Sequence, residues 1–184
     1  MKRVTQIALL AALTVPLLPI VGAAQTPPQP AGPLSAAMRA TLTRYTRNMP
    51  GAADLMPPDK YGFKPTPEQM SFGEIIAHEA DSNETLCAAI AGGTQTPTES
   101  MAGATAPKDQ LVARLKKSFD SCGPVLDGLK ESALGDSVPF YGGRKATRAR
   151  AVIALAQDWA DHYAQAAMYL RLNGILPPSA RPRQ

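Results

Sequence analysis

The chain has 184 residues, of which 45% are hydrophobic and 18% are charged. Its 19 lysine and arginine residues against 15 aspartate and glutamate residues give a formal net charge of +4, which is too small an excess to indicate a polyanionic partner. Basic clusters such as Lys116–Lys117 lack the interleaved aromatic residues and motifs of a nucleic-acid site. We interpret them as solvated helix faces and exclude nucleic acid as a partner.

The N-terminal residues have the pattern of a secretory signal. Lys2 and Arg3 precede an apolar run that ends near Val21, and this run is shorter than the roughly 20 residues that a bilayer-crossing helix needs. Small residues follow at 22–24, where a signal peptidase could cut. We expect residues 1–24 to be a cleaved signal peptide, and the mature protein to be periplasmic or secreted, with no membrane span.

Proline and helical periodicity divide the remaining chain into three parts. Residues 25–33 read QTPPQPAGP, which is too rich in proline for a helix and predicts an extended linker. Residues 34–178 carry helical periodicity and predict one folded domain, and residues 179–184 predict a flexible tail.

The first predicted helix begins at Ser35, because apolar residues then recur at every third or fourth position through Met49. Pro50 predicts a kink or a stop, with the pattern resuming through Leu55. The next segment contains four prolines within residues 56–67, which exclude a helix. Within it, Tyr61 and Phe63 are two positions apart and would face the same way, covering one end of the core.

The second predicted helix has the best-defined start. Ser71 and Glu74 have the spacing of a capping box, in which each side chain accepts a hydrogen bond from the other residue's backbone N–H. Apolar residues then follow at helical spacing, and Gly92-Gly93 predicts the end of the helix. Residues 94–107 are small, polar and interrupted by proline, which predicts a loop.

Two further helices complete the predicted fold. Apolar spacing from Leu111 to Leu129 indicates a third helix, which Pro124 would bend, and residues 136–143 predict a second loop. The fourth helix has the most regular apolar seam, and Gly174 predicts its left-handed stop. The seam residues are Val152, Leu155, Trp159, His162, Ala166 and Tyr169. Four helices with no strand pattern predict an all-α four-helix bundle.

The two cysteines, Cys87 and Cys122, lie on neighbouring predicted helices. Export would place them in an oxidising compartment, where a thiol pair persists as a disulfide. We favour this bridge, which would stabilise the fold by about 3 to 4 kcal/mol if it were unstrained. The alternative is two buried thiols that pack as small apolar side chains.

The only two histidines indicate a metal site. His162 lies in the seam of the fourth helix with Asp158 one turn earlier, and His78 lies at the edge of the apolar face of the second helix. Two imidazoles and a carboxylate can bind zinc, nickel, iron or manganese and leave positions open. The alternative is a pair of core histidines with ordinary hydrogen-bond partners. Glu79 and Asn83 are further candidates for metal or ligand contact, although we expect Glu79 to be exposed.

Three stretches of the chain resemble the DinB family of DinB/YfiT-like four-helix bundles. These are residues 56–66, residues 71–78 and residues 161–178. The resemblance implies an up-down-down-up bundle with a metal ion held by one histidine of the second helix and by two histidines, four residues apart, on the fourth. His78 and His162 match two of these positions, and Asp158 stands at the third.

The resemblance also implies metal-dependent chemistry, since relatives include thiol-dependent transferases, an isomerase and hydrolase-like proteins. We therefore expect an exported enzyme whose divalent ion polarises a substrate carbonyl or lowers the pKa of a bound thiol or water. Its expected partner is an unidentified small molecule, with a homodimer left open. The alternative is a non-catalytic exported binding or structural protein whose metal site is structural or degenerate.

Overall fold

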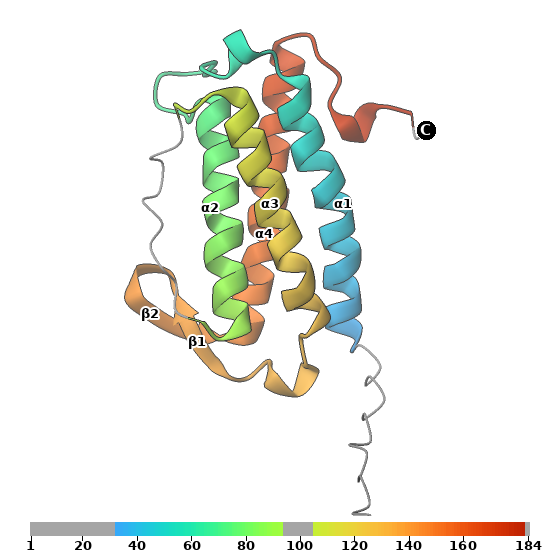
Figure 1. The fold of residues 1–184 in the computed structure, drawn as a ribbon, viewed down its shortest axis with the longest axis vertical. Coiled ribbons are helices and arrows are strands. Elements are labelled where there is room, and N and C mark those ends of the chain that lie inside the picture. Colours follow the sequence, from blue (N-terminus) through green and yellow to red (C-terminus); the bar gives the residue numbers. More distant parts are fainter. Residues whose placement is uncertain (1–31, 94–104, 183–184) are drawn as a thin grey trace, which may run out of the picture. The chain divides into compact units, whose positions relative to one another are not determined.

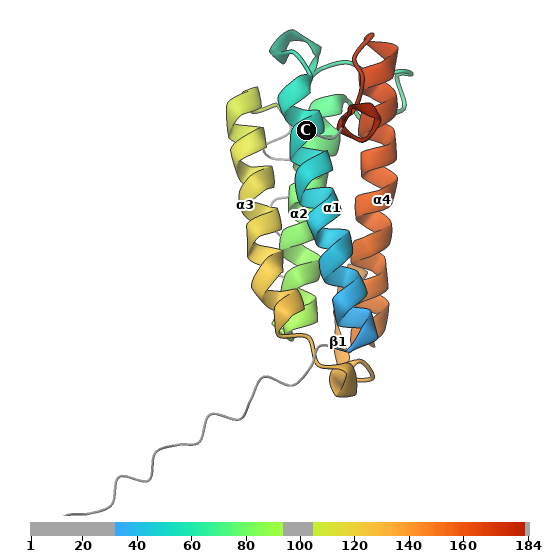
Figure 2. The same ribbon diagram turned by 90° about the vertical axis from the view of Figure 1, so that its right-hand side faces the viewer.

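The computed structural model of the chain describes residues 32–93 and 105–182. The predicted signal peptide and nearly all of the predicted linker lie outside these residues. Four helices form the fold: α1 (Pro33–Leu55), α2 (Phe72–Ala91), α3 (Lys108–Asp127) and α4 (Arg148–Leu172). Helices α1 and α4 run in one direction and α2 and α3 in the other (Figures 1 and 2). Helix α2 packs against both α3 and α4. Within the described ranges, no helix is long and apolar enough to cross a membrane.

Helix α2 begins and ends as its sequence predicts. The Ser71 hydroxyl accepts a hydrogen bond from the Glu74 backbone N–H, and the Glu74 carboxylate accepts one from the Ser71 backbone N–H, so the capping box is complete. At the other end, Gly92 adopts a left-handed conformation with φ of 85°, which a residue with a Cβ adopts only at a cost. The position of His78 along α2 is therefore fixed by local sequence.

Helix α1 continues through Pro50 instead of ending there. Proline removes one backbone hydrogen bond from a helix interior, at a cost of about 3 kcal/mol. The last turn is nevertheless held by burial, because Met49, Ala52 and Ala53 are each at most 1% exposed. The sequence left open whether the helix stops at Pro50 or continues beyond it, and tertiary packing favours continuation.

Tyr61 and Phe63 cover one end of the core, as predicted. The Tyr61 ring lies 5.3 Å from that of Phe72, and its hydroxyl donates a hydrogen bond to the Ala53 carbonyl at 2.7 Å. The Phe63 ring packs edge-on against Tyr169, 5.8 Å away. The proline-rich segment between α1 and α2 is therefore part of the core.

The prediction of a fold without strands was wrong for the segment that precedes α4. Strands β1 (Ser137–Phe140) and β2 (Arg144–Thr147) pair antiparallel, with Phe140 opposite Arg144. Gly142 and Gly143 both have positive φ, 65° and 70°, which lets the chain reverse between the strands. The hairpin packs against α2 and α4 (Figure 1).

The C-terminal segment also differs from the sequence prediction. Residues Pro178–Ala180 form a short 3-10 turn that packs against α1. The backbone N–H of Ser179 donates a hydrogen bond to the Tyr163 hydroxyl at 3.0 Å. The segment predicted as a loose tail from residue 179 is therefore tied down at its first residues.

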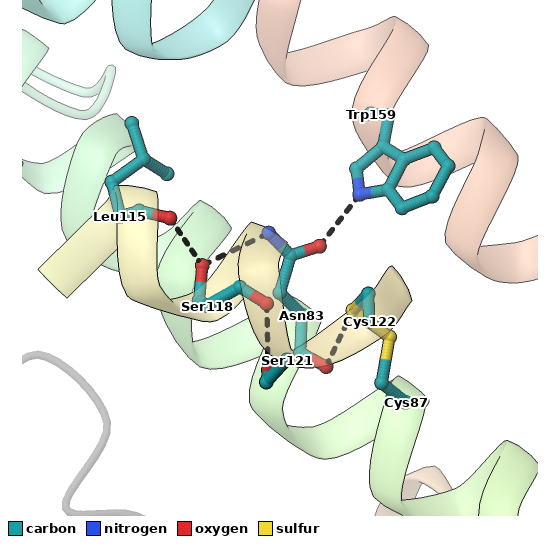
Figure 3. Close-up of a disulfide and its surroundings, with 7 residues drawn as sticks. All are labelled: Asn83, Cys87, Leu115, Ser118, Ser121, Cys122 and Trp159. Atoms are coloured by element: carbon teal, nitrogen blue, oxygen red, sulfur yellow. Dashed lines mark hydrogen bonds between the residues drawn. A yellow bond between two sulfur atoms is a disulfide. The ribbon is translucent and has the colours of Figure 1, made fainter. Parts of the chain in front are cut away.

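A disulfide and a polar network join α2 to its neighbours (Figure 3). Cys87 on α2 is bonded to Cys122 on α3, with their Cα atoms 5.5 Å apart. One turn before Cys87, the Asn83 amide donates to the Ser118 hydroxyl at 3.0 Å and accepts from the Trp159 indole N–H at 2.6 Å. Both side-chain polar atoms of Asn83 are therefore engaged in helix packing, and a role for this residue as a metal ligand is not favoured.

Candidate metal centre

Three side chains from two helices converge between α2 and α4. Because Asp158 and His162 are four residues apart on α4, they lie on the same face, and this face meets His78 on α2. Asp158 Oδ1 lies 3.4 Å from His162 Nε2 and 4.0 Å from His78 Nε2. The two imidazole rings have centroids 4.5 Å apart. The three candidate ligands that the sequence proposed thus present one atom each within 4.8 Å of one another.

These distances fit a single metal ion. With metal–ligand bonds of about 2.1 Å, ligand atoms around a tetrahedral ion are about 3.4 Å apart. Two polar atoms also lack a hydrogen-bond partner among the described residues, namely Asp158 Oδ2 and His162 Nδ1. Buried polar atoms without partners are rare in folded proteins. Oδ2 of the Asp158 carboxylate is therefore free to bind a cation.

The electrostatics of the site favour a neutral imidazole at His78. Burial, followed by the nearby His162, lowers the pKa of His78, and Asp158 opposes this effect only in part. Neutral imidazole is the form that binds a metal ion. The side chain of His78 is 37% exposed, compared with 9% for His162, so the site is reached from solvent on the side of His78.

Glu79 is completely buried, and the expectation that it would be exposed was wrong. Neither of its carboxylate oxygens has a hydrogen-bond partner among the described residues. Burial is the main cause of a raised pKa for Glu79, and the charge of Asp158 adds to it. Sequence reasoning placed Glu79 at the margin of the apolar face, because periodicity alone does not show how closely α4 approaches.

Two hydroxyl groups that sequence reasoning missed lie beside the imidazoles. Ser82 Oγ is 3.4 Å from His78 Nε2, and the Ser82 side chain also hydrogen-bonds the hydroxyl of Tyr141 on the β1–β2 hairpin. Burial, and then the charge of Asp158, raise the pKa of Tyr141 to about 12, so this phenol keeps its proton at neutral pH. The sequence signal for Tyr141 was its place immediately before Gly142 and Gly143. This place brings Tyr141 to the site only because the β1–β2 hairpin forms.

A large cavity lies elsewhere in the described fold. It has a volume of about 960 Å³ and lies between the end of α1, the start of α2 and the start of α3. Tyr61, Glu74 and Lys108 are among its lining residues, and none of the three converging side chains lines it. We base the candidate site on donor geometry, because a cavity of this size without convergent ligands indicates no chemistry by itself.

Comparisons with known proteins identify the family and show the same fold. A family model described as the DinB superfamily matches residues 41–166, which include all three converging side chains. A DinB-like protein from Bacillus subtilis is 20% identical, with a TM-score of 0.64 over 80% of this chain and 99% of its own. A DinB-like protein from Bacillus cereus is 12% identical, with a TM-score of 0.65 over 78% of this chain and 95% of its own.

A third solved structure has a stated activity. Mycothiol-dependent maleylpyruvate isomerase is 18% identical, with a TM-score of 0.58. The match covers 74% of this chain but only 60% of the isomerase. At these identities the likeness shows a shared fold. No curated protein sequence matches the chain.

Proposed function

This chain belongs to the DinB superfamily, and from that premise we propose that it is a metal-dependent enzyme whose ion is held by His78, Asp158 and His162. The observation that carries the proposal is the convergence of two imidazole nitrogens on one carboxylate oxygen, at 3.4 and 4.0 Å. Three protein ligands leave at least one coordination position for water or substrate, which is the arrangement of a catalytic site. Asp158 would favour harder ions such as manganese or iron more than a third imidazole would.

The residues around the open position limit what the site can do. When bound, the ion would polarise a carbonyl oxygen or lower the pKa of a bound thiol or water. Tyr141 keeps its proton at neutral pH and would donate a hydrogen bond to an oxygen atom bound there. Ser82 holds the Tyr141 hydroxyl beside His78. We infer that the substrate is a small molecule with an oxygen donor, which enters on the exposed side of His78.

We also propose that the protein works outside the cytoplasm. The N-terminal signal pattern supports this, and a bond between Cys87 and Cys122 is in keeping with an oxidising compartment. Export would separate the enzyme from abundant cytosolic thiols. We therefore favour bound water over a thiol co-substrate as the group that the ion activates.

Metal content tests the proposed function directly. The protein is purified without chelator and its metal is measured by elemental analysis, beside a His78→Ala, His162→Ala double variant. Asp161→Asn serves as a matched control, because Asp161 is an exposed α4 carboxylate that accepts a hydrogen bond from the side-chain amide of Gln165. We expect stoichiometric metal in the wild type and the control, and none in the double variant. A wild type that holds no metal, and gains no thermal stability with zinc, nickel, manganese or iron, would refute the proposal.

A further inference from the structure

The buried carboxylate of Glu79 has no compensating positive charge among the described residues. Two acidic residues are buried in the described fold, Glu79 and Asp81. Asp81 pairs with the guanidinium of Arg114. Glu79 is 0% exposed, and among the described residues neither of its oxygens has a hydrogen-bond partner. Proteins bury a carboxylate almost only when it is paired or bound to metal, and otherwise the group keeps its proton, so a cation beside Glu79 would allow it to ionise.

The charge of Asp158 is of the wrong sign to pair with Glu79. It contributes to the raised pKa of Glu79, and helices α2 and α4, which carry the two residues, pack against each other. Among the described residues, Asp158 Oδ2 also lacks a hydrogen-bond partner. Two acids with three unpartnered oxygens therefore lie at one packed interface. Such an arrangement is unfavourable unless positive charge is present between or beside them.

We propose that Glu79 is a second carboxylate of the metal centre, which acts with Asp158 to balance both charges of a divalent cation. This inference rests on the proposed function. Glu79 is not in the three-residue group whose ligand atoms lie within 4.8 Å of one another, so we assign it to the surroundings of the ion rather than to the ligands. It would be a positioning residue, which acts on the bound ion through its charge.

The proposal explains why an acidic side chain occupies this place. A leucine of similar size would pack against α4 without an electrostatic cost, yet the chain carries a carboxylate. With Asp158 alone, a divalent ion would leave one uncompensated positive charge in a largely buried site. With Glu79 as well, two negative charges balance the two positive charges of the ion, and the occupied site is neutral.

The test is the affinity of the purified protein for Zn²⁺ and for Mn²⁺, measured by competition with a chromophoric chelator. Glu79→Gln keeps the shape of the side chain and removes its charge. We expect the dissociation constants to rise about 10- to 100-fold, as for other residues that support metal ligands. The Asp161→Asn control removes an equal but exposed charge from α4 and should leave both constants unchanged.

Thermal unfolding gives a second readout. Glu79→Gln should leave the melting temperature of the metal-free protein close to that of the wild type, because both side chains are buried without partners, and should reduce the gain on adding metal. A purely structural residue would lower both values. Glu79→Asp keeps the charge and should retain more of the metal affinity than Glu79→Gln, and it provides the comparison if the glutamine variant does not fold.

The outcomes separate this inference from the proposed function. If the wild type binds metal and the double histidine variant does not, but Glu79→Gln binds as tightly as the wild type, the role of Glu79 is refuted and the metal site stands. If the wild type binds no metal, both proposals fail.

Discussion

Removing the Cys87–Cys122 disulfide should destabilise the protein by an amount that depends on the length of the loop that the bond closes. The bridge closes a loop with a sequence separation of 35 residues. For a loop of this length, the chain-entropy relation gives about 4 kcal/mol at 25 °C. Both cysteines are at most 3% exposed, so a Cys87→Ala, Cys122→Ala variant also loses some buried apolar contact. We therefore expect a loss of about 4 kcal/mol in the free energy of unfolding.

Urea denaturation of the double variant and of the two single variants measures this loss. Each substitution breaks the same bond, so the two single losses should not add, and each should approach that of the double variant. In thermal scans the loss corresponds to a decrease of roughly 10 °C in melting temperature. Two free thiols in the denatured, unreduced wild type would refute the reasoning. The reasoning would also be refuted if the losses in free energy of the two single variants summed to the loss of the double variant.

Three further predictions follow from the site and the core. Metal affinity should fall as pH decreases below the ordinary histidine pKa of 6.5, because protons then compete with the metal for the imidazoles. The lowered pKa of His78 shifts this competition to lower pH. Isothermal titration at a series of pH values measures the affinity. Tyr141→Phe should leave the dissociation constant of the metal unchanged. It should weaken binding of acetohydroxamate to the metal-loaded protein about fivefold, the equivalent of one lost hydrogen bond. Equal binding of acetohydroxamate by the wild type and the variant would argue against a contact between Tyr141 and the ligand. Tyr61→Phe should cost about 1 kcal/mol at neutral pH. Because burial raises the pKa of Tyr61 above its ordinary value of 10.0, the contribution of Tyr61 to stability is fully present below pH 10.0 and is lost as pH rises toward this raised pKa. The variant should lack this part of the alkaline decline in denaturant titrations.

Sequence reasoning succeeded where local signals agree with the final packing. The capping box of Ser71 and Glu74 and the glycine at position 92 determine both ends of α2 from neighbouring residues alone. The seam of α4 placed Asp158 and His162 one turn apart on a single face, and the structure keeps them there. Because His78 is fixed by the start of α2, all three candidate ligands could be named before their distances were known.

The features that the sequence did not reveal depend on contacts between distant segments. The β1–β2 hairpin has only four residues in each strand and contains Pro139, so its pattern was too short and too irregular to predict. It nevertheless brings the hydroxyl of Tyr141 to Ser82, 59 positions earlier in the sequence. Similarly, Glu79 was expected to be exposed at a helix junction, and its complete burial depends on packing between helices that periodicity does not show.

The disulfide and the Asn83 network bear on the metal centre as well as on stability. A metal site needs its ligands held to within about 0.5 Å, and the three candidate ligands come from only two helices. Asn83 lies one turn beyond Glu79 on α2, and its partner Trp159 directly follows Asp158 on α4. The 2.6 Å bond between them fixes the register of α2 against α4 at the level of the site. Because Cys87 and Ser118 tie the same turns of α2 to α3, movement of α2 away from α4 would have to break a buried network on two sides. The burial of Glu79 is therefore maintained by the same contacts that align His78 with Asp158 and His162.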